Sequence, residues 1–318
     1  MTPTYDRSPS WQLQELLSQG GFLAPLLGLS CRRVADCELD VHLRRDDEVH
    51  VYCGLTKLIT VHLARNGTVR VSMRETYSNQ PCAKALCRHW RTDETGFNDA
   101  LIAYLTQVRV DPRYVEAEGS VQTKWSRVTE PWIPFDREAA LSYESKIDSE
   151  ESRQFDQVYN ACAELSIIIQ DDSRRWAILP EKLGDELDQM AVDSEGNLVL
   201  VELKYAATSA TSGVYYAPLQ LLQYVWEWYN ALDAVRSSLQ ELLNARVALG
   251  LTPACAPQIT GGIRAAIGFG NDCRSKEVRR RYDIVLNVVN AHLPPGILGI
   301  ETWSLPNTSG RIRPVPIP

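Results

Sequence analysis

Three charged residues in the middle of the chain lie in segments that are otherwise apolar. Asp188 belongs to one apolar run, and Glu202 and Lys204 belong to the next, with thirteen residues between Asp188 and Glu202. Charged side chains are rarely buried unless they are paired or bind a metal, so this group needs a chemical explanation. Two carboxylates can hold a divalent cation, and a nearby lysine can polarise a bound water.

The two apolar runs have the pattern of a β-hairpin. Residues 187–192 and 198–203 are rich in β-branched and apolar side chains, and the Asp-Ser-Glu-Gly-Asn sequence at 193–197 is typical of a tight turn. A register that pairs Val192 with Leu198 places Asp188 opposite Glu202. Because strand side chains alternate between faces, Glu202 and Lys204 then share one face and Leu203 points to the other.

A second interpretation is that Glu202 and Lys204 form a solvated pair on an amphipathic edge strand. The flanking residues argue against it. Val199, Leu200, Val201 and Leu203 form a nearly continuous apolar run, which is typical of a strand covered on both faces.

The pattern of Asp188, thirteen residues and then Glu202-Leu203-Lys204 resembles the PD-(D/E)XK nuclease superfamily. The resemblance covers roughly residues 145 to 305, and Leu187 stands where the name-giving motif has proline. It implies a restriction-endonuclease-like fold and a metal-dependent nuclease, with DNA as the expected substrate. Asp188, Glu202 and the Leu203 carbonyl would bind Mg²⁺ or Mn²⁺, and Lys204 would be the catalytic lysine.

A helical segment after the hairpin extends the resemblance. Gln220-Leu-Leu-Gln-Tyr224 resembles the Q-x-x-x-Y motif of RecB-type members, and residues four apart share one helical face. The resemblance implies that Gln220 and Tyr224 position Lys204 or the substrate. Alternatively, Tyr224 is a core residue, because it also lies within an apolar helical stripe formed by Leu219, Leu222, Val225 and Trp228.

A further metal ligand is expected on the helix before the hairpin. The sequence predicts that this helix begins at Asp148, with Ser149 as its N-cap and Glu151 one turn before Phe155 on the apolar face. In the resembled superfamily this helix often supplies an acidic residue, so Glu151 is the first candidate and Glu164 the second. Stabilisation of the helix dipole explains Glu151 equally well.

The chain of 318 residues is long enough for two domains. Apolar and polar residues alternate at 41–43, 49–52, 59–63 and 69–73, which predicts an antiparallel meander. With helices at 11–17 and 97–108, residues 1–140 are predicted to form an N-terminal α+β domain. Residues 141–318 predict an α/β domain with a mixed sheet flanked by helices. Its later elements are a helix over 215–249 broken near 231–233, a strand at 264–269, another helix, a strand at 297–305 and a surface tail at 307–318.

Charge is distributed unevenly along the chain. The net charge is −7, but residues 136–195 hold 16 acidic and 6 basic residues, a net of −10, so the rest of the chain carries +3. A basic run at Arg274, Lys276, Arg279, Arg280 and Arg281 could hold phosphates, with a solvated helix face as the alternative.

Composition indicates a soluble cytoplasmic protein. No apolar run reaches the roughly 20 residues of a membrane span, and no basic and apolar leader precedes residue 30. The eight cysteines form no C-x-x-C pair, which favours free thiols in a reducing compartment. Zinc at Cys82, Cys87 and His89 is an alternative that lacks a fourth ligand.

The residues leave several functions open besides a DNA nuclease. These are a non-cleaving nucleic-acid-sensing or interaction module on a nuclease scaffold, a metal-dependent RNase, and a nuclease regulated by a ligand in the N-terminal domain. A homo-oligomer or a regulatory partner bound through that domain is also compatible with the sequence.

Overall fold

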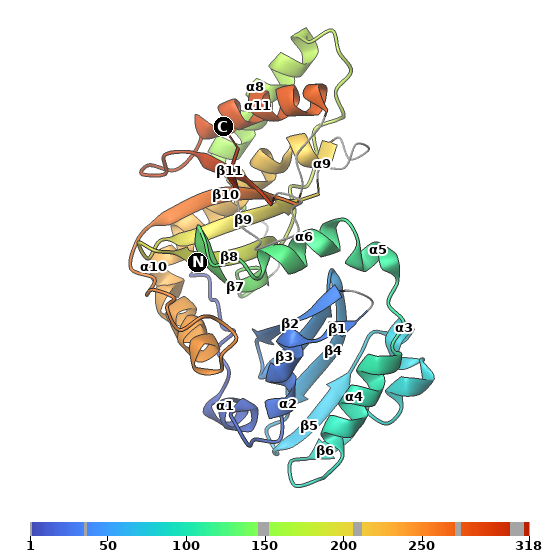
Figure 1. Ribbon diagram of the computed structural model, residues 1–318. Coiled ribbons are helices and arrows are strands. Elements are labelled where there is room, and N and C mark those ends of the chain that lie inside the picture. Colours follow the sequence, from blue (N-terminus) through green and yellow to red (C-terminus); the bar gives the residue numbers. More distant parts are fainter. Residues whose placement is uncertain are drawn as a thin grey trace. The chain divides into compact units, whose positions relative to one another are not determined.

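The computed structural model describes residues 2–34, 37–145, 153–205, 212–270, 275–305 and 315–317 (Figure 1). The chain forms two compact units, and neither is a single stretch of sequence. Unit 1 consists of Met1–Tyr5, Val128–Arg236 and Pro257–Pro318, and unit 2 consists of Asp6–Arg127 and Ser237–Ala256.

Unit 2 is built on an antiparallel sheet of six strands, β1 to β6, that follow one another in chain order. Their bounds are Arg33–Val34, Cys37–Arg44, Glu48–Cys53, Thr56–Leu63, Thr68–Ser72 and His89–Arg91. Val41 lies opposite Val51, and Val51 lies opposite Ile59. All three are buried, so the apolar positions of the alternating pattern form a core on one face. The predicted antiparallel meander is confirmed.

Short helices complete unit 2. They are α1 (Trp11–Leu17), α2 (Ala24–Leu27), α3 (Glu75–Ser78), α4 (Phe97–Gln107), α5 (Pro112–Val115) and α6 (Glu118–Trp125), with 3₁₀ turns η1 (Gly28–Cys31) and η2 (Pro81–Ala83). The Ser10 hydroxyl accepts a hydrogen bond from the Leu13 amide and so caps α1. The helices predicted at 11–17 and 97–108 are confirmed to within one residue.

Unit 1 is built on a mixed sheet with the strand order β12-β11-β10-β9-β8-β7. In chain order the strands are β7 (Trp132–Ala139), β8 (Leu187–Asp193), β9 (Leu198–Lys204), β10 (Ile263–Phe269), β11 (Ile300–Ser304) and β12 (Val315–Pro316). Strand β9 runs antiparallel to β8 and parallel to β10. The mixed α/β architecture predicted for this part of the chain is therefore present.

Strand β7 explains why the units divide earlier than the boundary at 140/141 suggested by the sequence. It pairs along its length with β8, for example Trp132 with Asp193 and Ala139 with Leu187. Residues 132–139 therefore belong to the mixed sheet of unit 1.

Unit 1 contains the longer helices α8 (Asp156–Asp171) and α11 (Lys276–Asn290) and the short α9 (Ser212–Tyr215). Helix α10 (Ala217–Ala248) belongs to unit 1 up to Arg236 and to unit 2 from Ser237. Helix α11 buries Val278, Tyr282, Val285 and Val289, which lie at the helical spacing of an apolar stripe. Figure 1 shows α8 and α11 side by side. The structure has no described helix with the length and apolarity that a membrane crossing requires.

Three details of the predicted elements are wrong. Helix α8 begins at Asp156, because Phe155 has an extended backbone, although the sequence placed the start at Asp148. Helix α10 continues through 231–233 without a break, since an exposed aspartate without Gly or Pro does not interrupt a helix. The tail contributes β12, which pairs with β11, at the sheet edge where proline is tolerated.

Candidate functional site

The β8–β9 hairpin has the register expected from the sequence. Val192 pairs with Leu198, and the ladder continues to Gln189 opposite Val201. The next position along each strand brings Asp188 beside Glu202. The turn depends on Gly196, whose φ is +80° and whose Cβ, if present, would lie 2.5 Å from the Gln258 carbonyl oxygen.

The predicted charged side chains come together at the open end of this hairpin. Glu202 is completely buried, and Lys204 Nζ donates a hydrogen bond to Glu202 Oε1 at 2.5 Å. The amide of Leu203 donates to Asp188 Oδ2 at 2.8 Å. The Lys204 side chain remains 15% exposed. A ligand can therefore reach this cluster, in which Glu202 is buried and Asp188 is half-buried.

The electrostatics of the carboxyl pair are unfavourable to its charged form. Burial raises the pKa of Glu202 to about 8, and the neighbouring Asp188 charge adds to the shift, whereas Lys204 opposes it. Burial also raises the pKa of Asp188. Among the described residues, no donor hydrogen-bonds to Glu202 Oε2. The pair thus resists full ionisation, and Glu202 largely keeps its proton at neutral pH.

Helix α10 places the two predicted motif residues beside this pair. The Tyr224 hydroxyl donates to the Glu186 carbonyl at 2.8 Å, and Gln220 Nε2 lies 3.4 Å from the Tyr224 hydroxyl. The pKa of Tyr224 is raised by burial and by the charges of Glu202 and Asp188. Tyr224 therefore stays protonated as a hydrogen-bond donor facing the carboxylates, and it also belongs to the core.

Gly184 is part of the site and was not anticipated from the sequence. Its φ is +112°, and a Cβ there would lie 2.3 Å from the Tyr224 hydroxyl and 2.8 Å from Gln220 Nε2. Gln223 Nε2 donates to the Gly184 carbonyl at 3.2 Å. The segment before β8 therefore lies directly on the Gln220–Tyr224 pair, and only glycine fits at its closest point.

A second polar cluster anchors the same segment to α10. Arg153 Nε lies 3.1 Å from Glu227 Oε1, and Arg153 Nη1 lies 2.9 Å from Asp185 Oδ1. The Tyr143 hydroxyl also donates to Glu227 Oε1, at 3.0 Å. Glu227 follows Tyr224 by three residues and is only 3% exposed. An acidic residue at a buried helical position was the sequence signal that could have revealed this cluster.

The two acidic candidates predicted before the hairpin are Glu151 and Glu164, and only Glu164 belongs to the described residues. Glu151 lies outside the described residues, and the later start of α8 removes the helical spacing from Phe155 on which its placement depended. Glu164 is half-exposed and pairs with His292 at 3.1 Å. Its prediction as a metal ligand is not supported, because its carboxylate is engaged with a residue that follows α11.

The site offers two carboxylates as possible metal ligands. Within the described ranges, no group of three or more His, Cys, Asp or Glu residues is placed to hold a metal ion. Two carboxylates are nevertheless compatible with Mg²⁺, which commonly binds one or two protein carboxylates and keeps several waters. Glu202 Oε2, which accepts no hydrogen bond from the described residues, could serve as a ligand to such a cation.

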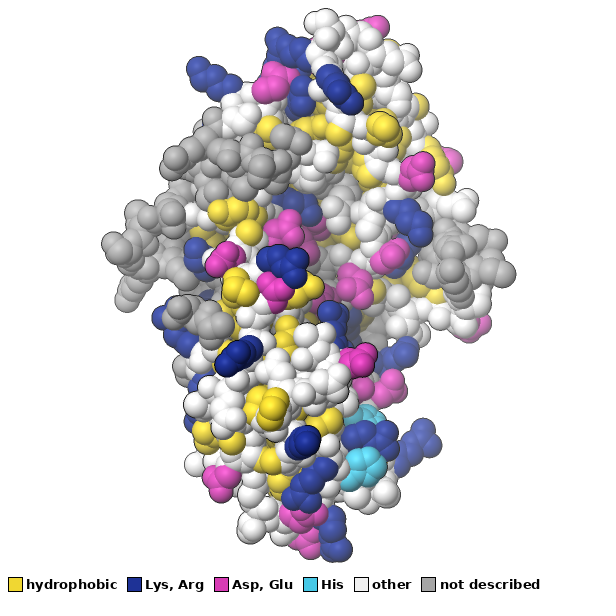
Figure 2. All heavy atoms as spheres, turned by 90° about the vertical axis from the view of Figure 1, so that its right-hand side faces the viewer, with side chains coloured by type: hydrophobic (Ala, Val, Ile, Leu, Met, Phe, Trp, Pro, Cys, Tyr) yellow, Lys and Arg dark blue, Asp and Glu magenta, His cyan; other side chains and the backbone are white. Residues whose placement is uncertain are grey.

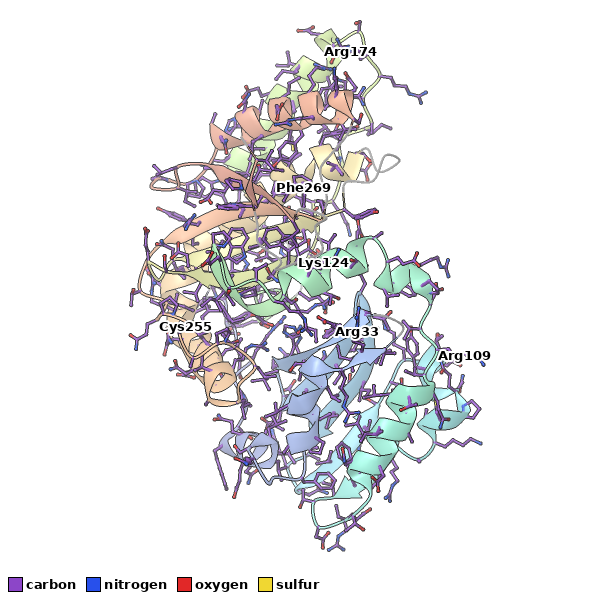
Figure 3. All side chains as sticks on the ribbon, in the orientation of Figure 1. Arg33, Arg109, Lys124, Arg174, Cys255 and Phe269 are labelled. Atoms are coloured by element: carbon purple, nitrogen blue, oxygen red, sulfur yellow. The ribbon has the colours of Figure 1, made fainter. Side chains whose placement is uncertain are left out.

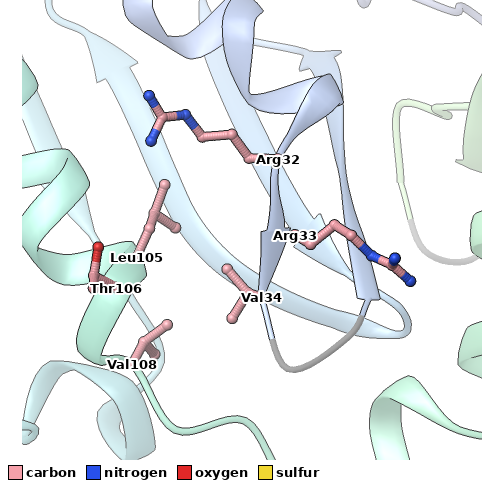
Figure 4. Close-up of a pocket in the computed structure, with 6 residues that line it drawn as sticks. All are labelled: Arg32, Arg33, Val34, Leu105, Thr106 and Val108. Atoms are coloured by element: carbon pink, nitrogen blue, oxygen red, sulfur yellow. The ribbon is translucent and has the colours of Figure 1, made fainter.

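A cavity of about 380 Å³ in unit 2 has a different lining (Figure 4). Its lining residues are Arg32, Arg33, Val34, Leu105, Thr106 and Val108. Arg32 extends on the side of Leu105, and Arg33 points the opposite way. Among the described residues that line it there is no acid, so the β8–β9 hairpin is the stronger candidate for hydrolytic chemistry.

Comparisons with protein-family models, with the curated proteins and with the solved structures gave no match to this chain.

Proposed function

We propose that this protein is a metal-dependent phosphodiester hydrolase that acts on DNA. The observation that carries this proposal is the convergence of Asp188, Glu202 and Lys204 at one end of a buried hairpin, where Glu202 Oε2 has no hydrogen-bond donor among the described residues. Burying charges without compensation is costly. A site that keeps them is best explained by a cation and an anionic substrate.

Asp188 and Glu202 would hold Mg²⁺ or Mn²⁺, together with the Leu203 carbonyl. When bound, the metal supplies a water of lowered pKa and offsets the charge of the phosphate. Because the metal would also neutralise the carboxyl pair, it would lower the raised pKa of Glu202.

Lys204 is the catalytic residue in this proposal. Its ammonium lies 2.5 Å from Glu202 Oε1, on the partly exposed side of the pair. From there it can donate to a phosphate oxygen as negative charge develops in the transition state.

Gln220 and Tyr224 act as positioning residues. The Tyr224 hydroxyl is committed to the Glu186 carbonyl, two residues before Asp188. Helix α10 therefore fixes the segment from Gly184 to Glu186, and with it the start of β8. This arrangement supports a role in orienting the Asp188 carboxylate.

The order of elements supports a restriction-endonuclease-like fold for unit 1. Helix α8 is followed by the β8–β9 hairpin, α10, β10, α11 and β11, with β9 parallel to β10. This is the arrangement expected from the resemblance of Asp188, Glu202 and Lys204 to the PD-(D/E)XK superfamily.

A nuclease assay tests the proposal. Linear duplex, circular duplex and single-stranded DNA, and RNA, are incubated with and without Mg²⁺ or Mn²⁺. We expect metal-dependent cleavage of DNA that is lost in Asp188→Asn and Glu202→Gln. Asp233→Asn is the matched control, because Asp233 lies on α10 with a side chain that is 98% exposed. Cleavage that survives both site substitutions would contradict the assignment.

Calorimetry separates metal binding from cleavage. Titration with Mg²⁺ should give a binding signal in the unmodified protein and none in Asp188→Ala or Glu202→Ala. Retained affinity in both variants would exclude these carboxylates as the ligands. Metal binding without cleavage of any of the four substrates would instead favour a non-cleaving interaction module, and cleavage of RNA alone would favour an RNase.

A further inference from the structure

Basic residues gather around the start of α11 in a chain that is acidic overall. The α11 basic patch consists of Arg174 and Arg175, which follow α8, and four residues of α11: Lys276, Arg279, Arg280 and Arg281. Lys and Arg side chains gather at the top of the face shown in Figure 2, over this part of unit 1. Segments 171–176 and 275–283 together hold six basic and four acidic residues, whereas residues 136–195 carry a net charge of −10.

Two carboxylates hold three arginines of the patch, Arg174, Arg280 and Arg281, in place. Asp172 accepts hydrogen bonds from Arg280 at 2.5 Å and from Trp176 Nε1 at 2.9 Å. Glu277 accepts from Arg174 at 2.8 Å and from Arg281 at 3.0 Å. The guanidinium groups therefore lose less conformational entropy when they bind an anion.

Much of the positive charge is still accessible. The Arg174 side chain is 55% exposed despite its pairing, and Arg175, Lys276 and Arg279 are exposed. The N-terminus of α11, capped by Ser275, adds the positive end of a helix dipole. The patch thus presents at least four accessible cationic side chains.

Aromatic residues attach the patch to α9. The Arg281 guanidinium lies 5.3 Å from the centre of the Trp176 ring and 5.5 Å from that of Tyr215. The Ala177 amide donates to the Tyr215 hydroxyl at 3.0 Å, and the Tyr216 hydroxyl donates to the Ala177 carbonyl at 2.7 Å. The loop after α8 is therefore held against α9 and α11.

The sheet connects the patch to Lys204. Phe269, at the end of β10, pairs with Lys204 at the end of β9, and the Gly270 amide donates to the Lys204 carbonyl at 3.1 Å. The Phe269 ring lies 5.6 Å from the ring of Tyr282 on α11, one residue after Arg281. Figure 3 labels Phe269, at the end of β10, and Arg174, in the α11 basic patch. Helix α11, which carries most of the patch, thus contacts the end of the sheet at which Lys204 lies.

We propose that the α11 basic patch binds backbone phosphates of the DNA whose scissile phosphate lies at Asp188, Glu202 and Lys204. This inference rests on the proposed function. Cationic side chains that neutralise phosphates release condensed counterions, so the affinity depends on salt in proportion to the contacts made. The patch would supply affinity and orientation without reading base sequence.

The salt dependence of binding tests the patch. The affinity for a fluorescent 24-base-pair duplex is measured by anisotropy in EDTA at several KCl concentrations, with the full chain and with Lys276→Ala/Arg279→Ala. Loss of two phosphate contacts should reduce the slope of log affinity against log salt by about two. The matched control is Arg65→Ala/Arg109→Ala, which removes two exposed arginines of unit 2 and should leave the slope unchanged.

Two further measurements keep the inference separate from the proposed function. Thermal unfolding shows whether the double variant is folded, and hydrolysis of bis(p-nitrophenyl) phosphate with Mn²⁺ reports on the catalytic site without using the patch. We expect normal hydrolysis of this small diester in the double variant. A reduced slope without any hydrolysis by the unmodified protein would reject the hydrolase and retain the patch. A slope equal to that of the control, or no binding of DNA at all, would overturn the patch.

Discussion

The β8–β9 hairpin holds two buried acidic centres that differ in how their charges are satisfied. At the turn, Asp193 accepts hydrogen bonds from the amides of Glu195 and Asn197 and from Arg264 Nη1. Although burial raises the pKa of Asp193, the hydrogen bonds from Arg264 and Asn197 hold it below its usual value. At the open end, the pKa of Glu202 is instead raised to about 8 by burial and by Asp188.

The difference separates the structural carboxylate Asp193 from Glu202, which belongs to the proposed functional centre. Both Asp193 and Glu202 are buried on neighbouring strands. Asp193 has donors enough to stabilise its charge, and Arg264 also binds Glu301. Glu202 shares one lysine with a second carboxylate. Burial alone therefore does not mark a candidate site, whereas burial of a carboxylate without sufficient donors does.

Asp193→Ala tests the structural centre and should have the largest effect. It removes the turn's acceptor and one partner of Arg264, so we expect a loss of about 2–4 kcal/mol in the free energy of unfolding. Glu202→Gln should leave that free energy level near pH 7 and raise it above about pH 8, because glutamine cannot ionise, whereas Glu202 loses its proton near pH 8. Urea unfolding of the metal-free proteins measures both. Equal destabilisation by the two substitutions would remove the distinction between the centres.

Lys204→Ala tests the functional centre. Lysine is proposed to act on the transition state and not on the metal, so kcat should fall by about two orders of magnitude or more while Mg²⁺ affinity persists. Single-turnover cleavage and calorimetry measure the two quantities, with the exposed Lys182→Ala as the control. Near-normal turnover in Lys204→Ala would make this lysine a structural ion-pair partner of Glu202.

Gln220→Ala tests the support that α10 gives to the functional centre. We expect cleavage to fall about tenfold, or about 1.4 kcal/mol, with little change in Tm, because the Gln220 amide lies beside Tyr224 and not in the apolar core. The neighbouring Leu222 is fully buried, and Leu222→Ala should cost about 2–5 kcal/mol of stability. An active Gln220→Ala enzyme would remove the motif assignment but would leave Asp188, Glu202 and Lys204 in place.

The contributions of Glu202 and Asp193 to the free energy of unfolding should also change with pH in opposite directions. Of the expected effects, this is the smallest. The pKa of Glu202 is raised from 4.5 to about 8 in the folded protein, so its contribution to stability is present below about pH 4.5 and is lost as the pH rises towards 8. The pKa of Asp193 is lowered from 3.8, so its contribution is lost as the pH falls below that value.

Melting temperatures of the metal-free protein at pH 5 and pH 8 measure the Glu202 contribution. We expect Tm to fall between these values, and to fall less in Glu202→Gln, which has no group that titrates there. An identical pH dependence of Tm in the two proteins would show that folding does not raise the pKa of Glu202.

The hairpin was predictable because its signals are local. The turn residues at 193–197 and the alternation on each side determine the register, and the register brings Asp188 to Glu202. Gly184 and Glu227 could not be found in this way, because each acquires its role from contacts between segments about 40 and 70 residues apart. The start of α8 was misplaced because Ser149-Glu150-Glu151 has a capping composition, and composition alone does not determine whether a helix forms.

The interleaving of the two units has a consequence for how the chain folds during synthesis on the ribosome. Unit 2 includes Ser237–Ala256, where Arg246 is buried and donates to the carbonyl of Val41 and to the hydroxyl of Thr252. Residues 6–127 are therefore translated long before the helical segment that completes their unit, and β7 likewise precedes β8 by about 50 residues. Neither unit can complete its native contacts in the order in which the chain emerges, so a nascent chain released after Arg127 or after Ala139 should depend on chaperones to remain unaggregated.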